Sequence, residues 1–287
     1  MRSVGIVGVG LIGGSFGLAL RSAGFAGRIV GVSSEGTIRD AIARGAIETG
    51  VPLEQAATEC DLIYIAQPIS TIETTLETLG PLAPENCLIT DAGSTKSRII
   101  EKAGKVVSKA QFLGGHPMAG KESRGVTAAA ADLFRGRPYI LTPTESSSLH
   151  TPLASVFRNW VERCGAHIIS VSAAEHDRAV AFTSHLPQLA STALAYSLAE
   201  NLEDESHLGL AGPGLADMSR LALSSYDIWR DILNTNTENI QHVLDVYIDK
   251  LTELRDNLQT QRLGDVFATA AAIASRIRRP NNNKGHV

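Results

Sequence analysis

The sequence predicts an α/β protein in which a Rossmann-like, doubly wound and mostly parallel sheet is followed by an all-α dimerisation domain. A glycine-rich turn joins the first apolar run to the first helical pattern. Strand and helix patterns then alternate, and the strand patterns stop at Ser172. We therefore expect a dinucleotide-binding domain over residues 1–172 and a helical substrate-binding and dimerisation domain over residues 173–287.

The composition is typical of a globular protein and argues against several classes of partner. The 287 residues are 44% hydrophobic and 20% charged, and the formal net charge is −4. A mildly acidic chain without a basic block favours neither nucleic acid nor an anionic membrane. The sequence shows neither a signal-peptide pattern nor an apolar run long enough to span a membrane. We expect a cytoplasmic protein that acts on a small molecule.

The cysteines predict neither a disulfide framework nor a metal site. Cys60, Cys87 and Cys164 are few and far apart, without a Cys-x-x-Cys pair. Both a disulfide scaffold and a cysteine zinc site need closer and more numerous cysteines. This pattern fits a reducing compartment, and we expect no metal.

The glycine-rich turn carries a dinucleotide-binding fingerprint in its proper context. An apolar strand pattern at Val4–Val7 precedes it, and a helical pattern over Gly14–Leu20 follows. The first glycine permits the tight turn, the second lets a pyrophosphate approach the backbone, and the third lets the helix pack on the strand. The helix N-terminus then offers N–H groups to the phosphates. The cofactor-binding residues predicted here are Gly8, Gly10, Leu11, Ile12 and Gly13.

The second predicted strand, Arg28–Val32, favours NADP over NAD. An NAD site usually ends this strand with a carboxylate that binds the ribose hydroxyls, but here Ser33 and Ser34 follow the strand. The hydroxyls can donate to a 2′-phosphate, and Arg39 or Arg44 can add positive charge. Glu35 weakens this prediction because it could bind the ribose itself. The serines could also simply cap the next helix.

Polar loops are expected to meet where the parallel strands end. Buried-strand patterns at Asp61–Ala66 and Leu88–Asp91 lead into Gln67-Pro68 and Asp91–Lys96, and His116 follows a third such run. Ligands of doubly wound sheets bind outside the carboxyl ends of the strands. Gln67 and Pro68 are therefore predicted cofactor contacts, and the three loops should converge near the nicotinamide. Further strands are predicted at Tyr139–Thr142 and His167–Val171, with a helix from Pro152 to about Arg163 between them.

The second half reads as helices. Residues 173–201 predict one long helix that Pro187 bends. A capping box is predicted at Thr235–Glu238, and another in the first half of the chain at Ser70–Glu73. A later helix has apolar residues spaced alternately by four and three, which is a heptad seam. That seam could be an ordinary core helix, but its length favours a dimer helix. Its members are Ile240, Leu244, Tyr247, Leu251, Leu254 and Leu258. An alanine-rich helix then ends at Pro280, and residues 281–287 should fray.

Two specific stretches carry a resemblance to a known family. Residues 114–120 read Gly-Gly-His-Pro-Met-Ala-Gly, and residues 184–187 read Ser-His-Leu-Pro. Together they resemble the prephenate and arogenate dehydrogenases of tyrosine biosynthesis, which are homodimers. Further matching stretches follow in family order from the first residues to about Asn239: 8–15, 91–96, 139–144, 175–177, 217–220 and 227–232.

The resemblance implies an NAD(P)-dependent oxidative decarboxylation. A hydride leaves C4 of the cyclohexadiene ring for the nicotinamide, the C4 hydroxyl loses a proton, and CO2 leaves as the ring becomes aromatic. His116 matches the catalytic histidine, whose neutral imidazole can accept the proton near pH 7. Ser94 matches the serine that hydrogen-bonds the same hydroxyl, although it could also be a helix cap. Arg220 matches the arginine that grips the ring carboxylate with two parallel bonds.

Other positions are carried over with lesser roles. His185 matches a histidine near the substrate, and Trp229 is expected to wall the pocket or to pack in the core. Glu122 is expected to face the substrate side chain. His176 and Asp177 resemble part of an entrance network.

The substrate is predicted to be prephenate, with arogenate as the alternative. Some members carry a basic residue four positions before the matched arginine, where this chain has Ala216. Losing that cation slightly favours arogenate, which adds an ammonium group, although Lys121 could compensate.

Two other functions are weighed against this one. A hydroxy-acid dehydrogenase usually has a catalytic lysine on the first long helix of its second domain, and residues 173–201 contain no lysine. A non-catalytic NAD(P)-sensing dimer would not need Ser94, His116 and Arg220 together. The sequence therefore favours prephenate dehydrogenase activity.

Overall fold

The computed structural model describes residues 1–121, 123–202 and 204–278, and the predicted frayed tail lies outside them. The chain divides into two compact units, residues 1–240 and the residues from Gln241 onward. The predicted domain boundary at residues 172/173 falls inside the first unit and stays a prediction.

The first unit is built on one eight-stranded sheet with the order β3-β2-β1-β4-β5-β6-β7-β8. All neighbouring strands run parallel except β6 and β7, which pair antiparallel with His116 opposite Ile140. The predicted Rossmann-like, mostly parallel sheet is therefore confirmed. The strands are β1 (Ser3–Val7), β2 (Arg28–Val32), β3 (Thr49–Gly50), β4 (Leu62–Ile65), β5 (Leu88–Asp91), β6 (Gln111–Pro117), β7 (Pro138–Thr142) and β8 (His167–Ser170).

Helices cover the sheet because its central strands are apolar on both faces. Every residue of β4 and β5 is buried, as expected for strands packed between helical layers. Phe16 of α1 stacks on Tyr64 of β4, with ring centroids 4.0 Å apart. The helices that alternate with these strands along the chain are α1 (Leu11–Ser22), α2 (Glu35–Ala43), α3 (Leu53–Glu59), α4 (Ile69–Leu79), α5 (Ser97–Val106) and α6 (Pro152–Arg163).

The predicted long helix over residues 173–201 is interrupted by a π-helical turn. It consists of α7 (Ala173–Val180), a π turn at Ala181–His185 and α8 (Leu186–Asn201). Pro187 is the second residue of α8 and follows the π turn directly, so it lies inside a continuous helical run. The predicted helical run over residues 173–201 with Pro187 inside it is confirmed, the irregularity beside the proline is a π turn, and the bend at Pro187 stays a prediction.

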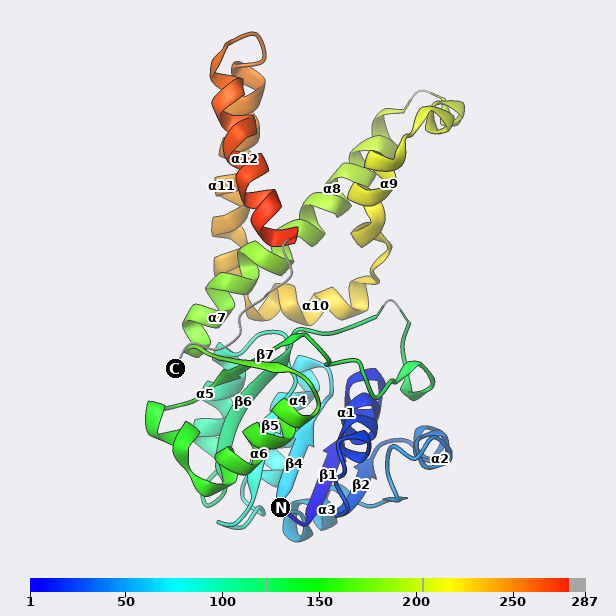
Figure 1. Cartoon of the computed structure of the whole chain (residues 1–287), viewed down its shortest axis with the longest axis vertical. Helices are drawn as coiled ribbons and strands as arrows, with labels where there is room; N and C mark the ends of the chain where they lie inside the picture. The colour runs from blue at the N-terminus through cyan, green and yellow to red at the C-terminus, as the bar shows by residue number, and fades with distance from the viewer. Residues whose placement is uncertain (122, 203, 279–287) are drawn as a thin grey trace. The chain divides into compact units, whose positions relative to one another are not determined.

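Helix α10 (Tyr226–Thr235) crosses the unit close to the start of α4 (Figure 1). Asp231 accepts hydrogen bonds from the backbone N–H and the hydroxyl of Ser70, at 3.0 and 2.7 Å. The hydroxyls of Thr95 and Thr235 lie 2.7 Å apart. Both predicted capping boxes were wrong, because Ser70 caps no helix and α11 begins only at Thr237. A helix α9 (Pro213–Ser219) precedes α10.

The second unit is a helical hairpin made by α11 (Thr237–Asp256), from Gln241 onward, and by α12 (Arg262–Arg278) (Figure 1). On the predicted heptad seam, Leu251 is 47% exposed. Leu258, predicted as its last helical member, lies beyond the end of α11 and is 70% exposed. Large apolar side chains are rarely left open in a row without a partner surface. None of the described helices combines the length and hydropathy that crossing a membrane would require.

Candidate active site

An open cleft of about 470 Å³ lies at the carboxyl ends of the parallel strands. It is bounded by the start of α1, by the loops after β4 and β5, by the segment after β6 and by α10. Doubly wound sheets bind ligands at this edge. Several predicted site residues line this one cleft, namely Leu11, Ile12, Gln67, Pro68 and Ser94.

The glycine fingerprint has the geometry that a pyrophosphate needs. Gly8 has φ +88°, a conformation that residues with a Cβ rarely adopt. A Cβ on Gly13 would lie 2.2 Å from the Gly8 carbonyl oxygen, so α1 packs against the turn only because this residue is glycine. A Cβ on Gly10 would meet nothing within 4 Å. The space above Gly10 and the N–H groups of α1 fit a diphosphate.

The residues expected to choose between NAD and NADP are all solvent-exposed. Ser33 and Ser34 follow β2, and Ser34 is the N-cap position of α2. Its hydroxyl lies 3.0 Å from that of Thr37. Arg39 lies one helical turn after Glu35, with 4.0 Å between the charged atoms. An exposed pair at this distance is weak, so the guanidinium can turn to an anionic ligand.

His116 stands at the end of β6 and is the first member of a hydrogen-bonded chain. Its Nδ1 lies 2.8 Å from Nε2 of His176, whose Nδ1 lies 2.8 Å from Oδ1 of Asp177. His116 is half-buried, whereas His176 and Asp177 are each only 1% exposed. The expectation that His176 and Asp177 form an entrance network was therefore wrong, because both side chains are buried and His176 is hydrogen-bonded to His116.

Asp177 also holds the start of α5. Its carboxylate accepts the backbone N–H groups of Lys96 and Ser97, at 2.7 and 2.8 Å. Burial alone would raise the pKa of Asp177, but the hydrogen bonds from His176, Ser97 and Lys96 outweigh it and lower the pKa. Asp177 is therefore an ionised carboxylate. It caps the N-terminus of α5, a role that the sequence had also allowed for Ser94.

A buried ion pair fixes the backbone beside His116. Lys96 is bonded to Asp91 through a short contact, and its ammonium also donates to the carbonyl of Gly115 at 2.8 Å. The other carboxylate oxygen of Asp91 accepts the N–H of Gly115 at 3.1 Å. Because Lys96 and Asp91 are both fully buried, this pair clamps the residue immediately before His116.

The surroundings keep the His116 imidazole neutral. Burial lowers its pKa well below the ordinary value of 6.5, and His176, Lys96 and His185 lower it further, while Asp177 opposes them. A neutral imidazole has one ring nitrogen that can accept a proton. With Nδ1 engaged by His176, Nε2 is the nitrogen left for a substrate.

His185 belongs to a second hydrogen-bonded group. The π turn directs it inward, where it is 1% exposed and its Nδ1 lies 3.3 Å from Nδ2 of Asn236. Burial lowers the pKa of His185 to about 4. Trp229 of α10 packs edge-on against the His185 ring, with centroids 5.8 Å apart, and donates to Ser224 at 3.1 Å. π turns often occur at functional sites.

The structure gives less detail for two other predicted substrate-binding residues. Arg220 begins a short 3-10 turn at Arg220–Leu223 and is exposed. Glu122 lies outside the described residues. Arg124 and Arg230 also line the cleft, although neither was predicted from the sequence. With Lys121 they give the cleft three cations, which face the carboxylates of Asp227 and Asp231 in the same lining.

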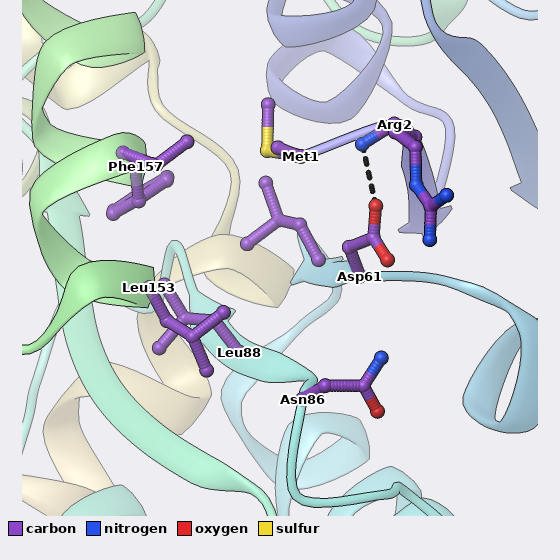
Figure 2. Close-up of a pocket in the computed structure, with 9 residues that line it drawn as sticks. Met1, Arg2, Asp61, Asn86, Leu88, Leu153 and Phe157 are labelled. Carbon is purple, nitrogen blue, oxygen red and sulfur yellow. Dashed lines mark hydrogen bonds between the residues drawn. The ribbon is translucent and has the colours of Figure 1, made fainter.

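A second cavity lies at the opposite edge of the sheet, where β1, β4 and β5 begin (Figure 2). Its volume is about 210 Å³, and Leu88, Leu153 and Phe157 contribute to its wall. Figure 2 shows the backbone N–H of Arg2 donating to Asp61 at its rim. Because it lies away from the glycine turn, it is not part of the candidate site.

Comparison with known families gives matches over most of the chain. Residues 16–170 match the model for the prephenate dehydrogenase nucleotide-binding domain. Residues 172–271 match the model for the prephenate dehydrogenase dimerization domain. A prephenate dehydrogenase of Bacillus subtilis is 34% identical over 272 residues, which cover 91% of this chain and 71% of that protein.

Solved structures give similar matches. The prephenate dehydrogenase of A. aeolicus, in complex with hydroxyphenyl propionate and NAD+, has a TM-score of 0.88 at 29% identity. The match covers 96% of this chain and 98% of that one. The arogenate dehydrogenase of Synechocystis has a TM-score of 0.81 at 31% identity and covers 96% of this chain and 99% of its own.

Proposed function

Because the chain belongs to the prephenate dehydrogenase family, we propose that it catalyses the NAD(P)-dependent oxidative decarboxylation of prephenate to 4-hydroxyphenylpyruvate in tyrosine biosynthesis. The observation that carries this proposal is a neutral, half-buried His116 at the edge of the sheet where a cofactor cleft opens. A nicotinamide cofactor, when bound, supplies the acceptor for a hydride from C4 of the substrate ring.

His116 and Ser94 act on the C4 hydroxyl in this proposal. Nε2 of His116 accepts the hydroxyl proton as the C4–H bond breaks, and Ser94 hydrogen-bonds the same oxygen. The ring then loses its carboxylate as CO2 and becomes aromatic. Arg220 binds that carboxylate, by its match to the family arginine, and His185 and Trp229 border the substrate. Glu122 is kept as a contact of the substrate side chain.

The cofactor would lie along the glycine turn, with the nicotinamide near Gln67, Pro68 and Ser94. We propose that NADP is preferred over NAD, because the exposed hydroxyls of Ser33 and Ser34 and the N-terminal N–H groups of α2 can bind a 2′-phosphate. Arg39 would add charge. The A. aeolicus relative was solved with NAD+, so the preference needs a direct measurement. We expect Ser34→Asp to weaken NADP binding at least tenfold and to leave NAD binding nearly unchanged.

Arogenate is the second candidate substrate. The Synechocystis relative is an arogenate dehydrogenase, and Ala216 replaces a basic residue found in some family members. Lys121 lines the cleft and could take over that contact. Arogenate dehydrogenase activity would still use His116, Ser94 and Arg220.

The test is nicotinamide reduction by the purified protein in a two-by-two design, with prephenate or arogenate and with NAD or NADP. Turnover of prephenate supports the proposal, and faster turnover with NADP supports the reading of Ser33 and Ser34. Turnover of arogenate alone would transfer the proposal to that substrate. Cofactor binding without turnover of either substrate would favour the NAD(P)-sensing dimer instead. His116→Asn is the matched variant, since it should keep cofactor binding and lose turnover.

We also propose that the protein is a homodimer formed through its helical part. The matching dimerization-domain model and the exposed apolar residues of the α11 seam support this. A cytoplasmic location is proposed from the composition alone.

A further inference from the structure

We propose that His176, held by Asp177, is a positioning residue that fixes the tautomer of His116 and leaves Nε2 of His116 unprotonated toward the substrate. The proposal rests on the function proposed above, because it assumes that His116 is the base. It assigns no new step. It explains how the fold selects, from two possible neutral forms of His116, the one that can accept a proton.

Asp177 is negatively charged, and its charge decides where the hydrogen of His176 lies. This carboxylate is buried and accepts three N–H groups, from His176 and from the backbone of Lys96 and Ser97. An ionised carboxylate can only accept hydrogen bonds. Nδ1 of His176, 2.8 Å from Oδ1 of Asp177, must therefore carry a hydrogen.

The tautomer of His116 follows from that of His176. A neutral His176 with a hydrogen on Nδ1 has a lone pair on Nε2. Since this Nε2 lies 2.8 Å from Nδ1 of His116, Nδ1 of His116 must be the donor and carry its hydrogen. Nε2 of His116 is then the acceptor. The opposite tautomer of His116 would bring two lone pairs together in a buried site, and an unpaired buried polar contact is costly.

The hydrogen bonds from His116 through His176 to Asp177 also stabilise His116 after it has taken up a proton. When Nε2 of His116 takes the C4 hydroxyl proton, the ring becomes a cation whose Nδ1–H still donates to His176. Asp177 is the carboxylate that favours this cation, and its charge reaches His116 through the polarised His176 ring. Neither His176 nor Asp177 needs to change its proton count, so the step remains one proton moved from substrate to His116.

The experiment combines a spectroscopic measurement with kinetics. The ¹⁵N chemical shifts of the histidine ring nitrogens distinguish protonated from unprotonated nitrogen, so we would record them in the full-length wild type and assign His116 by loss of its signals in His116→Asn. His176→Gln keeps an amide oxygen near the position of Nε2, whereas His176→Phe fills the space without an acceptor. His167→Gln, on an exposed position of β8, is the control.

We expect a hydrogen on Nδ1 of His116 in the wild type and in His176→Gln. In His176→Phe we expect a mixture of tautomers and a fall in kcat of about a hundredfold or more, within the range that general-base catalysis contributes. KM and cofactor affinity should change less than threefold, which also shows that the variant folds. His176→Gln should retain kcat within about tenfold of wild type, and His167→Gln should match wild type.

Three results would overturn the proposal. They are a hydrogen on Nε2 of His116 in the wild type, an undiminished kcat in His176→Phe, and an equal loss in the Gln and Phe variants with the His116 tautomer unchanged. If the wild type turns over neither substrate, the proposed function fails, and the ¹⁵N measurement still decides whether His176 fixes the tautomer.

Discussion

Asn236 donates one amide hydrogen to the carbonyl of Asp177 at 2.8 Å and directs the other toward Nδ1 of His185, 3.3 Å away. A carbonyl can only accept, so its contact fixes which end of the amide is the NH2 group. Nδ1 of His185 is therefore an acceptor, and the hydrogen of that neutral ring is on Nε2. His185 thus offers a donor where His116 offers an acceptor.

Replacement of Asn236 should weaken both stability and substrate binding. Asn236→Ala removes two buried hydrogen bonds and should lower the free energy of unfolding by about 1–3 kcal/mol. Without its amide, His185 can change tautomer, so we expect KM for the substrate to rise more than kcat falls. Denaturant titration and steady-state kinetics measure these effects. Asn234→Ala, an exposed change near the end of α10, the helix that Asn236 follows, should leave both near wild type, and equal losses in the two variants would contradict this role.

The pH dependence of kcat/KM should reflect the lowered pKa of His116. A base whose pKa is lowered stays neutral to a more acidic pH, so activity should be level through pH 6.5 and fall only below it. Burial and the neighbours His176, Lys96 and His185 lower this pKa, and Asp177 opposes them. Short assays, with enzyme returned to neutral pH to exclude unfolding, measure the profile. A midpoint at or above 6.5 would show that this environment does not act on the base.

The Asp91–Lys96 pair should respond differently to single and double substitution. Lys96→Met leaves a buried carboxylate without its cation and should destabilise the protein by about 3–5 kcal/mol. Asp91→Asn combined with Lys96→Met removes both charges and should cost less than the sum of the single changes. Denaturant titration of the four proteins gives the coupling energy. Additive losses would mean that the pair does not act as a unit.

The exposed part of the α11 seam should be needed for dimerisation. Leu251→Lys places a charge on an apolar residue that is 47% exposed, so we expect a monomer by light scattering coupled to size-exclusion chromatography. Asp249→Lys, an exposed polar position on the same helix, should remain a dimer. A Leu251→Lys protein that elutes as wild type would exclude this seam as the contact.

The sheet and its glycine turn could be predicted from the sequence because their signals are local. Val4–Val7, the fingerprint and the helix after it each follow from short-range spacing, and their order implies the parallel sheet. The π turn could not be predicted, since Ala181–His185 continues a helical pattern and only the backbone shows the wider turn. Propensity does not distinguish these helix types.

The hydrogen-bonded partners that lie next to His116 could not be predicted from the sequence either. Asp177 lies 61 positions from His116 in the chain, and nothing in its neighbours shows that it caps α5 from another helix. Asn236 was read only as part of a capping box. Long-range polar contacts depend on the packed fold, whereas His116 itself lies in a stretch specific enough to be selected directly.

The π turn at Ala181–His185 has a consequence for insertions and deletions. A π turn closes its hydrogen bonds over one residue more than an α turn does. Deleting one residue of this segment would let α7 and α8 join as a regular helix, in which each residue advances about 100° around the axis. His185 would then leave Asn236 and Trp229, although no side chain of the site had been altered. The extra residue therefore works as a spacer. The position of His185 relative to His116 depends on the number of residues in this segment as well as on their identity.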